Sequence, residues 1–254
     1  MNRIELFGCP MDVGTMTQTV ELIRDRIARS QFTQHVVVNV AKLVNMQADP
    51  ELAASVHACD IVNIDGMGVV WGARLLGHDV SERVAGVDLF ERLLDMAQQD
   101  GLPVFMLGGS EVVVQKAACA VSAKYPMLRI AGIHHGYFWD DERTVVDQIR
   151  ASGAKLLFVA ITSPRKENFI NRWKSQLGVD FVMGVGGTFD VVAGKVKRAP
   201  LWMQRSGLEW AFRVIQEPGR MWKRYLSTNS RFLVMLTGAY VSRLFRRKGE
   251  VDAH

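Results

Sequence analysis

Long apolar runs and paired cysteines are missing from this sequence of 254 residues. The first residues, MNRIELFGCPMDVG, contain no extended apolar stretch and no small-residue cleavage site, so we expect no signal peptide. The apolar run at 232–241 is shorter than the roughly 20 residues that a membrane-spanning helix needs. The three cysteines, Cys9, Cys59 and Cys119, form no C-x-x-C pair, and we expect them to be reduced, small core residues of a cytoplasmic protein.

Sequence motifs that identify several enzyme classes are absent as well. No D-x-D triplet occurs, which argues against the metal–diphosphate clamp of many sugar-nucleotide enzymes. There is no G-x-x-x-x-G-K-[ST] loop and no G-x-S-x-G elbow, so neither P-loop nor α/β-hydrolase chemistry is expected. His134 and His135 are adjacent and therefore poor partners for one metal ion, which favours structural roles. We predict no metal site and no cofactor.

Positive charge is concentrated near the C-terminus. The chain has a net charge of +5, but residues 197–248 contain twelve Lys or Arg and only two acids, Glu209 and Glu217, so that this stretch is +10 and the remainder −5. Such asymmetry indicates an anionic partner, which could be a membrane, a nucleic acid or a phosphate group. Interleaved tryptophans argue against a merely solvated basic face. We expect a membrane surface, contacted by interfacial helices, and no nucleic acid.

Strand-like and helix-like patterns alternate up to about residue 190. The apolar runs expected to be buried strands are 36–40, Ile61–Ile64, 104–107, 156–161 and 181–185. The amphipathic stretches expected to be helices include 88–99, Glu111–Lys124 and Glu142–Ala151. This alternation predicts an α/β fold with a Rossmann-like, mostly parallel sheet and helices on both faces. We expect a catalytic domain at 1–198 and a helical, basic appendage at 199–254, which Pro218 should break into two helices.

Residues that follow the strands are the candidates for chemistry, because ligands bind beyond the carboxyl ends of parallel strands. Asp65 ends the run Ile61–Ile64 and could act as a general base, or it could cap a helix that begins near Met67. The pairs Gly108-Gly109 and Gly186-Gly187 could cradle a phosphate through backbone N–H groups, or could simply form tight turns.

Two other functions remain open from these patterns. Gly66, Gly68 and Gly72 follow a strand with a spacing close to that of a dinucleotide-binding turn, which would suit a Rossmann-type nicotinamide-dependent oxidoreductase. The third glycine comes one residue late, so the signal is weak. A non-catalytic, membrane-associated binding module would instead use the basic tail alone.

An ordered set of motifs resembles one known family from about Ile4 to Tyr225. The motifs are D-G-x-G at 65–68, E-R-x-x-G-x-D at 82–88, L-G-G at 107–109, G-Y-F at 136–138, K-R-A-P-x-W-M at 197–203 and G-L-E-W at 207–210. Together they resemble the WecG/TagA/CpsF family, glycosyltransferase family 26. The resemblance implies an inverting, metal-independent, Rossmann-like enzyme of bacterial cell-surface or exopolysaccharide synthesis.

The substrates and location are likewise implied by the resemblance. The donor would be UDP-N-acetylmannosamine, its uronic acid or UDP-glucose, and the acceptor a sugar on a polyprenyl pyrophosphate. The appendage would dock on the cytoplasmic face of the inner membrane and complete the active site, making the protein cytoplasmic and peripherally membrane-associated. Exposed apolar helices on the appendage also leave a homo-oligomer open.

Roles carry over to the matching positions of this sequence. Asp65 would be the base that deprotonates the acceptor hydroxyl, Arg83 would stabilise the diphosphate leaving group, and Asp88 would orient Arg83 or cap a helix. The remaining positions expected to bind substrate are Asn39, Gly66, Gly108, Gly109, Lys166, Gly186 and Gly187, with Arg213, Arg220 and Arg224 as candidates for the acceptor pyrophosphate.

Two departures from the family pattern bear on specificity. Val37 stands where the family usually has Thr, and in TSPRKEN the positions of a family Lys-Gln pair are taken by Arg165 and Lys166. A cation replaces a neutral amide at position 166. We therefore predict a donor or acceptor different from that of the teichoic-acid members, such as an anionic uronic acid donor or an extra phosphate contact.

Overall fold

The computed structural model describes the backbone of residues 1–251, and the side chains of that range except 220 and 246–251. Its centre is a six-stranded parallel sheet in the spatial order β4-β3-β8-β7-β5-β6. The strands are β3 Thr33–Val38, β4 Ile61–Ile64, β5 Val104–Gly108, β6 Ile130–His134, β7 Leu156–Ala160 and β8 Phe181–Gly184. Every residue of β5, β7 and β8 is buried, as in strands covered on both faces. The predicted α/β fold is confirmed.

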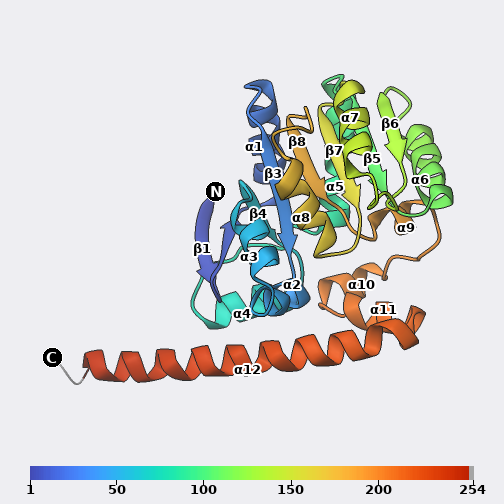
Figure 1. The fold of residues 1–254 in the computed structure, drawn as a ribbon. Helices are drawn as coiled ribbons and strands as arrows, with labels where there is room; N and C mark the ends of the chain where they lie inside the picture. Colours follow the sequence, from blue (N-terminus) through green and yellow to red (C-terminus); the bar gives the residue numbers. More distant parts are fainter. Residues whose placement is uncertain (252–254) are drawn as a thin grey trace.

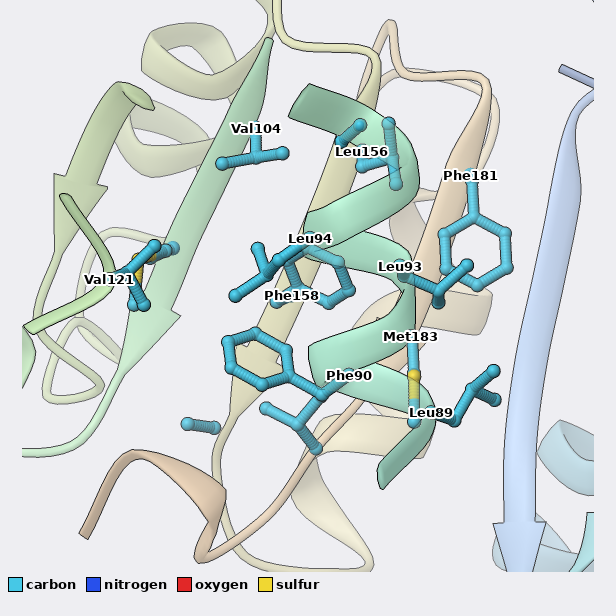
Figure 2. Packing of buried hydrophobic residues seen from close by; sticks show 14 of the residues in the cluster. Leu89, Phe90, Leu93, Leu94, Val104, Val121, Leu156, Phe158, Phe181 and Met183 are labelled. Carbon is cyan, nitrogen blue, oxygen red and sulfur yellow. The ribbon is translucent and has the colours of Figure 1, made fainter. Parts of the chain in front are cut away.

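Helices cover both faces of this sheet (Figure 1). One face carries α1 Met16–Ala28, α5 Gly86–Gln99 and α6 Glu111–Lys124, and the other carries α7 Glu142–Ala151 and α8 Arg165–Trp173. On the first face, α5 turns Leu89, Phe90 and Leu93 toward the sheet, where they pack near Phe158 (Figure 2). The rings of Phe90 and Phe158 meet edge to face with centroids 4.8 Å apart.

Shorter helices follow the strands that build the candidate site. They are α2 Val40–Met46 after β3, then α3 Pro50–His57, α4 Met67–Leu75 after β4, and α9 Thr188–Val192 after β8. Each begins close to the carboxyl end of its strand, except α3, which follows α2. The residues at these strand-to-helix turns therefore face the same edge of the sheet.

An N-terminal hairpin, β1 Asn2–Leu6 and β2 Cys9–Val13, docks beside the edge strand β4. Its anchor is the Asp12 carboxylate, which accepts two hydrogen bonds of 2.8 Å from the Arg3 guanidinium and one of 2.8 Å from the Val62 N–H. The sequence patterns did not predict this hairpin. The signal is weak because the strands are short, include Pro10, and pair with each other rather than with the main sheet.

The C-terminal helices lie across the carboxyl end of the sheet (Figure 1). They are α10 Leu201–Arg205, α11 Glu209–Gln216 and α12 Pro218–Val251. The predicted break at Pro218 is confirmed, because α11 ends at Gln216 and Pro218 begins α12. Among the described residues, no helix has both the length and the apolar character that a bilayer crossing requires.

α12 is tied into the hydrophobic core by one aromatic side chain. Phe232 is buried in the cluster formed by the hairpin, β4 and α4, and its ring meets that of Phe7 edge to face at 5.9 Å. Gly72 on α4 makes this approach possible, because a Cβ there would lie 2.9 Å from Phe232 Cζ. A packed residue of the predicted appendage thus completes a core that begins in the first strand.

Two details of the sequence prediction need correction. The strand β6 was not predicted, because its residues are only partly buried and give no continuous apolar signal.

Cys9 and Cys59 are buried, as expected, but Cys119 is exposed, so the expectation that all three cysteines are core residues is wrong for Cys119. α6 buries Val113, Val114, Ala117 and Val121, and position 119 falls on the opposite side of the helical repeat.

Substituting Phe232→Ala should lower the free energy of unfolding by about 3–5 kcal/mol, because it removes a buried ring from the cluster that holds α12. Urea denaturation measures this change. Leu233→Ala is the matched control, since that neighbouring side chain is 60% exposed and should cost little. Equal stabilities of the two variants would show that α12 is not anchored in this way.

Candidate active site

Three strands bring the predicted site residues to one place. β3 lies between β4 and β8 in the sheet, so the residues that follow these strands are neighbours at the carboxyl edge. Asn39 follows β3, Asp65 follows β4, and Gly186-Gly187 come just after β8. The chain passes from β3 to the edge strand β4 on one side of it, whereas β8, its neighbour on the other side, is the last strand of the sheet in the sequence. Such a reversal is where open α/β sheets bind ligands.

Asp65 lies at the centre of this group. Its N–H donates to the Val38 carbonyl at 2.8 Å, which extends the strand pairing. The N-cap residue of α4 is Gly66 and not Asp65, so the alternative role of Asp65 as an N-cap is not seen. Burial raises the pKa of the Asp65 carboxyl, while the positive charges of Arg83 and Arg213 act to lower it. A carboxylate with a raised pKa in such a setting suits general-base catalysis.

Val37 and Gly86 form part of the surroundings of Asp65. A Cβ built on Gly86 would lie 3.3 Å from Val37 Cγ2 and 3.8 Å from Asp65 Oδ2, so all three residues meet. The backbone of Gly86 favours the ionised carboxylate by hydrogen bonding. Val37 presents methyl groups here, whereas the Thr that the family usually has at this position would present a hydroxyl.

Arg83 connects the core to the C-terminal helices. Its Nη1 donates to Glu209 Oε2 of α11 at 3.1 Å, and both side chains are largely buried. Arg213, one turn further along α11, lies 3.8 Å from the other Glu209 oxygen. The structure therefore brings together Asp65, Arg83 and Arg213, as the sequence predicted, and adds Glu209, which the sequence analysis did not select.

The predicted role of Asp88 needs correction. Its carboxylate accepts two hydrogen bonds from Arg198, Nη1 to Oδ1 at 2.5 Å and Nη2 to Oδ2 at 2.7 Å, and these raise the pKa of Arg198. Asp88 therefore neither orients Arg83 nor caps α5, whose cap residue is Ala85. This bidentate pair ties the start of α5 to the segment that leads into α10.

The two predicted glycine pairs differ in their surroundings. A Cβ on Gly186 or Gly187 would meet no atom within 4 Å, so a ligand can approach the backbone there. A Cβ on Gly108 would lie 2.4 Å from the carbonyl oxygen of Ala160, and the N–H of Gly109 already donates to that oxygen. Close strand packing accounts for Gly108, and a φ of 71° with Val113 of α6 close by accounts for Gly109.

The glycines that suggested a dinucleotide turn also have packing explanations. A Cβ on Gly68 would lie 2.9 Å from Val40 Cγ2, Gly72 makes room for Phe232, and Gly66 adopts a φ of 129° beside Asn39. The Asn39 side chain caps α2 by accepting from the Lys42 N–H at 3.1 Å. The observation that favoured an oxidoreductase is thus explained by helix packing.

Lys166 belongs to a buried cluster of three charges. Its Nζ lies 2.8 Å from Glu167 Oε1, which also pairs with Lys42 Nζ at 2.7 Å, and Lys42 donates to the Val37 carbonyl. Burial lowers the pKa of Lys166. Burial alone would raise the pKa of Glu167, but the positive charges of the two lysines outweigh that effect and hold the pKa of Glu167 low. The ammonium of Lys166 is therefore already paired, and its effect on donor choice stays a prediction.

The predicted appendage arginines are spread along α11 and α12. Arg213 faces Glu209, whereas Arg224 is exposed, and its charge acts on Lys166. The side chain of Arg220 lies outside the described residues.

Two hollows flank the Arg83–Glu209 pair. The larger one, of about 380 Å³, includes Arg74, Leu201 and Arg205, and the smaller one includes Gly187, Asp190 and Arg213.

Comparison with known proteins decides the family. The family model described as "Glycosyl transferase WecG/TagA/CpsF family" matches residues 4–248. The chain belongs to this family of glycosyltransferases. It is 38% identical over 179 residues to an N-acetylglucosaminyldiphosphoundecaprenol N-acetyl-β-D-mannosaminyltransferase of Bacillus spizizenii, covering 70% of this chain and 69% of that one. An enzyme of the same name from Bacillus subtilis is 37% identical over 188 residues, covering 74% and 73%.

Two groups of this glycosyltransferase were missed by sequence reasoning although they lie in its motifs. Arg198 belongs to K-R-A-P-x-W-M and Glu209 to G-L-E-W, both of which were recognised. Their partners, Asp88 and Arg83, are 110 and 126 residues away in the sequence. The motifs marked the positions, but the pairing is visible only in the fold.

Glu167→Gln should destabilise the transferase by about 3–5 kcal/mol, because two buried lysines lose the anion they share. Chemical denaturation at neutral pH measures this. Glu91→Gln is the control, because Glu91 pairs with Lys124 at the surface and should cost less than about 1 kcal/mol. A Glu167 variant no less stable than the Glu91 variant would contradict the role given to the buried cluster.

Proposed function

We propose that this glycosyltransferase moves a hexosyl unit from a UDP-sugar to a sugar on polyprenyl pyrophosphate, in bacterial cell-surface or exopolysaccharide synthesis. The donor sugar is N-acetylmannosamine, its uronic acid or glucose, and the names of the two Bacillus relatives favour N-acetylmannosamine. Those names also support N-acetylglucosamine on diphosphoundecaprenol as the acceptor. The observation on which the proposal depends is the position of Asp65 beside Arg83 and Arg213 at the carboxyl edge of the sheet.

The proposed reaction is a single displacement. Asp65 takes the proton of the acceptor hydroxyl while the hydroxyl oxygen bonds to the anomeric carbon, on the face opposite the nucleotide. The bond from that carbon to the diphosphate oxygen breaks, its electron pair leaves with UDP, and the configuration inverts. Arg83 takes up the charge of the diphosphate, and Arg213 adds to the positive field, so the mechanism requires no divalent cation.

The two hollows suggest where each substrate binds. We place the diphosphate of the donor at Arg83, which lines the larger hollow, and the nucleoside against Gly187 of the smaller hollow, where the backbone is open. The acceptor carries a lipid and must approach from the apolar side of the C-terminal helices. The larger hollow includes Leu201, which is 66% exposed on α10, and we place the acceptor sugar there.

The C-terminal helices present an apolar surface with basic residues between the apolar ones. Exposed large apolar side chains on them include Leu201, Trp202, Ile215, Leu226, Val234 and Phe245. Exposed apolar residues next to Lys and Arg are typical of helices that lie in a membrane interface. We propose that this surface docks on the cytoplasmic face of the inner membrane, with Arg213 and Arg224 as the described candidates for binding the acceptor pyrophosphate. A contact between two copies of the chain is the competing use of the same surface.

Asp65→Asn should reduce transfer by roughly 10²- to 10⁴-fold, because the amide cannot accept the proton of the acceptor. It should leave UDP binding intact, since Arg83 and the glycines remain. Product formation from UDP-sugars and a short-chain acceptor, together with the thermal shift produced by UDP, measures both quantities. An Asn variant that transfers at the rate of the wild type would rule out Asp65 as the base.

A double variant, Ile215→Glu with Leu226→Glu, should weaken binding to anionic phospholipid vesicles by at least roughly tenfold, because two exposed apolar side chains become charged. Vesicle co-sedimentation measures the binding, and gel filtration follows the assembly state. Met127→Glu serves as the control, since Met127 is 80% exposed in the turn between α6 and β6. Unchanged vesicle binding with a loss of self-association would assign this surface to subunit contacts instead.

A further inference from the structure

Glu209 is unusual among the charges of the C-terminal helices. Residues 197–248 contain only two acids among twelve basic residues, and Glu209 is one of them. It lies in the first turn of α11 with its side chain 20% exposed, turned toward the core rather than toward solvent. Its two oxygens face Arg83 at 3.1 Å and Arg213 at 3.8 Å. Glu209 thus contacts two of the arginines that we propose bind the phosphates of the substrates.

The contact leaves most of the Arg83 guanidinium available. Arg83 uses Nη1 for Glu209, and no further hydrogen bond or ion pair of its side chain occurs among the described residues. A guanidinium has five N–H donors in a planar fork, so Nε and Nη2 remain for phosphate oxygens. Arg83 belongs to the irregular segment between α4 and α5, where no regular backbone pairing fixes its long side chain. An anchor at Nη1 restricts its orientation.

We infer that Glu209 is a positioning residue, which holds Arg83 through Nη1 so that the rest of the guanidinium faces the diphosphate of the donor. The inference rests on the proposed function. It also means that the diphosphate site is complete only when α11 is docked on the core, because the anchor comes from that helix. Donor binding and the placement of the C-terminal helices are therefore linked through one ion pair.

Glu209 also influences Asp65 electrostatically. The charged groups that act on the Asp65 carboxyl are Arg83 from the core, and Glu209 and Arg213 from α11, together with the backbone of Gly86. Burial raises the pKa of Asp65, Glu209 raises it further, and the two arginines lower it. Removing the charge of Glu209 should therefore lower the pKa of Asp65, and the acid side of the pH–rate profile should move to lower pH.

Three variants of the full chain test the inference. Glu209→Gln removes the charge, Glu209→Asp keeps the charge but shortens the reach to Arg83, and Glu142→Gln is the control. Glu142 is also a largely buried carboxylate paired with an arginine, Arg172, but it lies on α7, away from the site. Thermal unfolding of all three variants shows how much stability the loss of such a pair removes.

For each variant, the dissociation constant of UDP, kcat and KM for the donor, and the pH profile of kcat/KM are measured. We expect both Glu209 variants to bind UDP roughly 10- to 100-fold more weakly than the wild type, because Arg83 is misplaced. The acid limb should lie at lower pH in Glu209→Gln than in Glu209→Asp, because both variants displace Arg83 but only the Gln variant removes the negative charge at position 209. Glu142→Gln should match the wild type in UDP affinity and pH profile.

Other outcomes would overturn the inference. Tighter UDP binding by Glu209→Gln would mean that the carboxylate competes with the diphosphate for Arg83. UDP affinity equal to that of the wild type in either Glu209 variant would mean that Arg83 needs no anchor. If instead the wild type itself neither binds UDP nor transfers from any UDP-sugar, the proposed function fails, and the two failures are thereby distinguished.

Discussion

A carboxylate can act as a base in a partly desolvated site only if neighbouring charges offset the cost of its ionisation. Burial raises the pKa of Asp65, and Arg83 and Arg213 oppose that rise with positive charge from two separate parts of the chain. Glu209 lies between the arginines and keeps their charges from being left unpaired. The Arg83–Glu209 pair connects α11 to the core at this point, and the proposed chemistry depends on the balance of these charges.

The same helices that complete the site also complete the core. Phe232 of α12 packs against Phe7 of the hairpin and over Gly72 of α4. Arg198, just before α10, holds Asp88 on α5 through two hydrogen bonds. Hydrophobic packing therefore fixes one end of the C-terminal segment relative to Asp65, and ion pairs fix the other end. The outward side of the segment still exposes apolar residues that could contact a membrane or a second copy of the chain.

Much of the fold could be predicted because parallel strands leave strong local signals. β5, β7 and β8 are fully buried, so each appears as a continuous apolar run, and Pro218 marks a helix start. β6 and the hairpin were missed because partial burial and short antiparallel pairing weaken the pattern. The motifs also selected Asp65 and Arg83, which both follow the strand β4 in one recognisable segment and which the fold brings close together.

What could not be predicted depends on contacts between distant parts of the sequence. The pairs Arg83–Glu209 and Arg198–Asp88 join residues more than a hundred positions apart, and Lys42 meets Lys166 only through Glu167. Local spacing contains no information about such partners. The spacing of Gly66, Gly68 and Gly72 gave only a weak dinucleotide-binding signal, and the packing role of Gly72 is visible only when α12 is seen against it.

The pH dependence of kcat/KM in Arg83→Gln, compared with the wild type, tests the electrostatic balance most directly. UDP-N-acetylmannosamine and a short-chain lipid pyrophosphate bearing N-acetylglucosamine are suitable substrates, and kcat/KM reports groups of the free enzyme. Loss of the positive charge at position 83 should move the acid limb to higher pH, together with a large drop in rate. An acid limb that keeps its wild-type position would contradict the account.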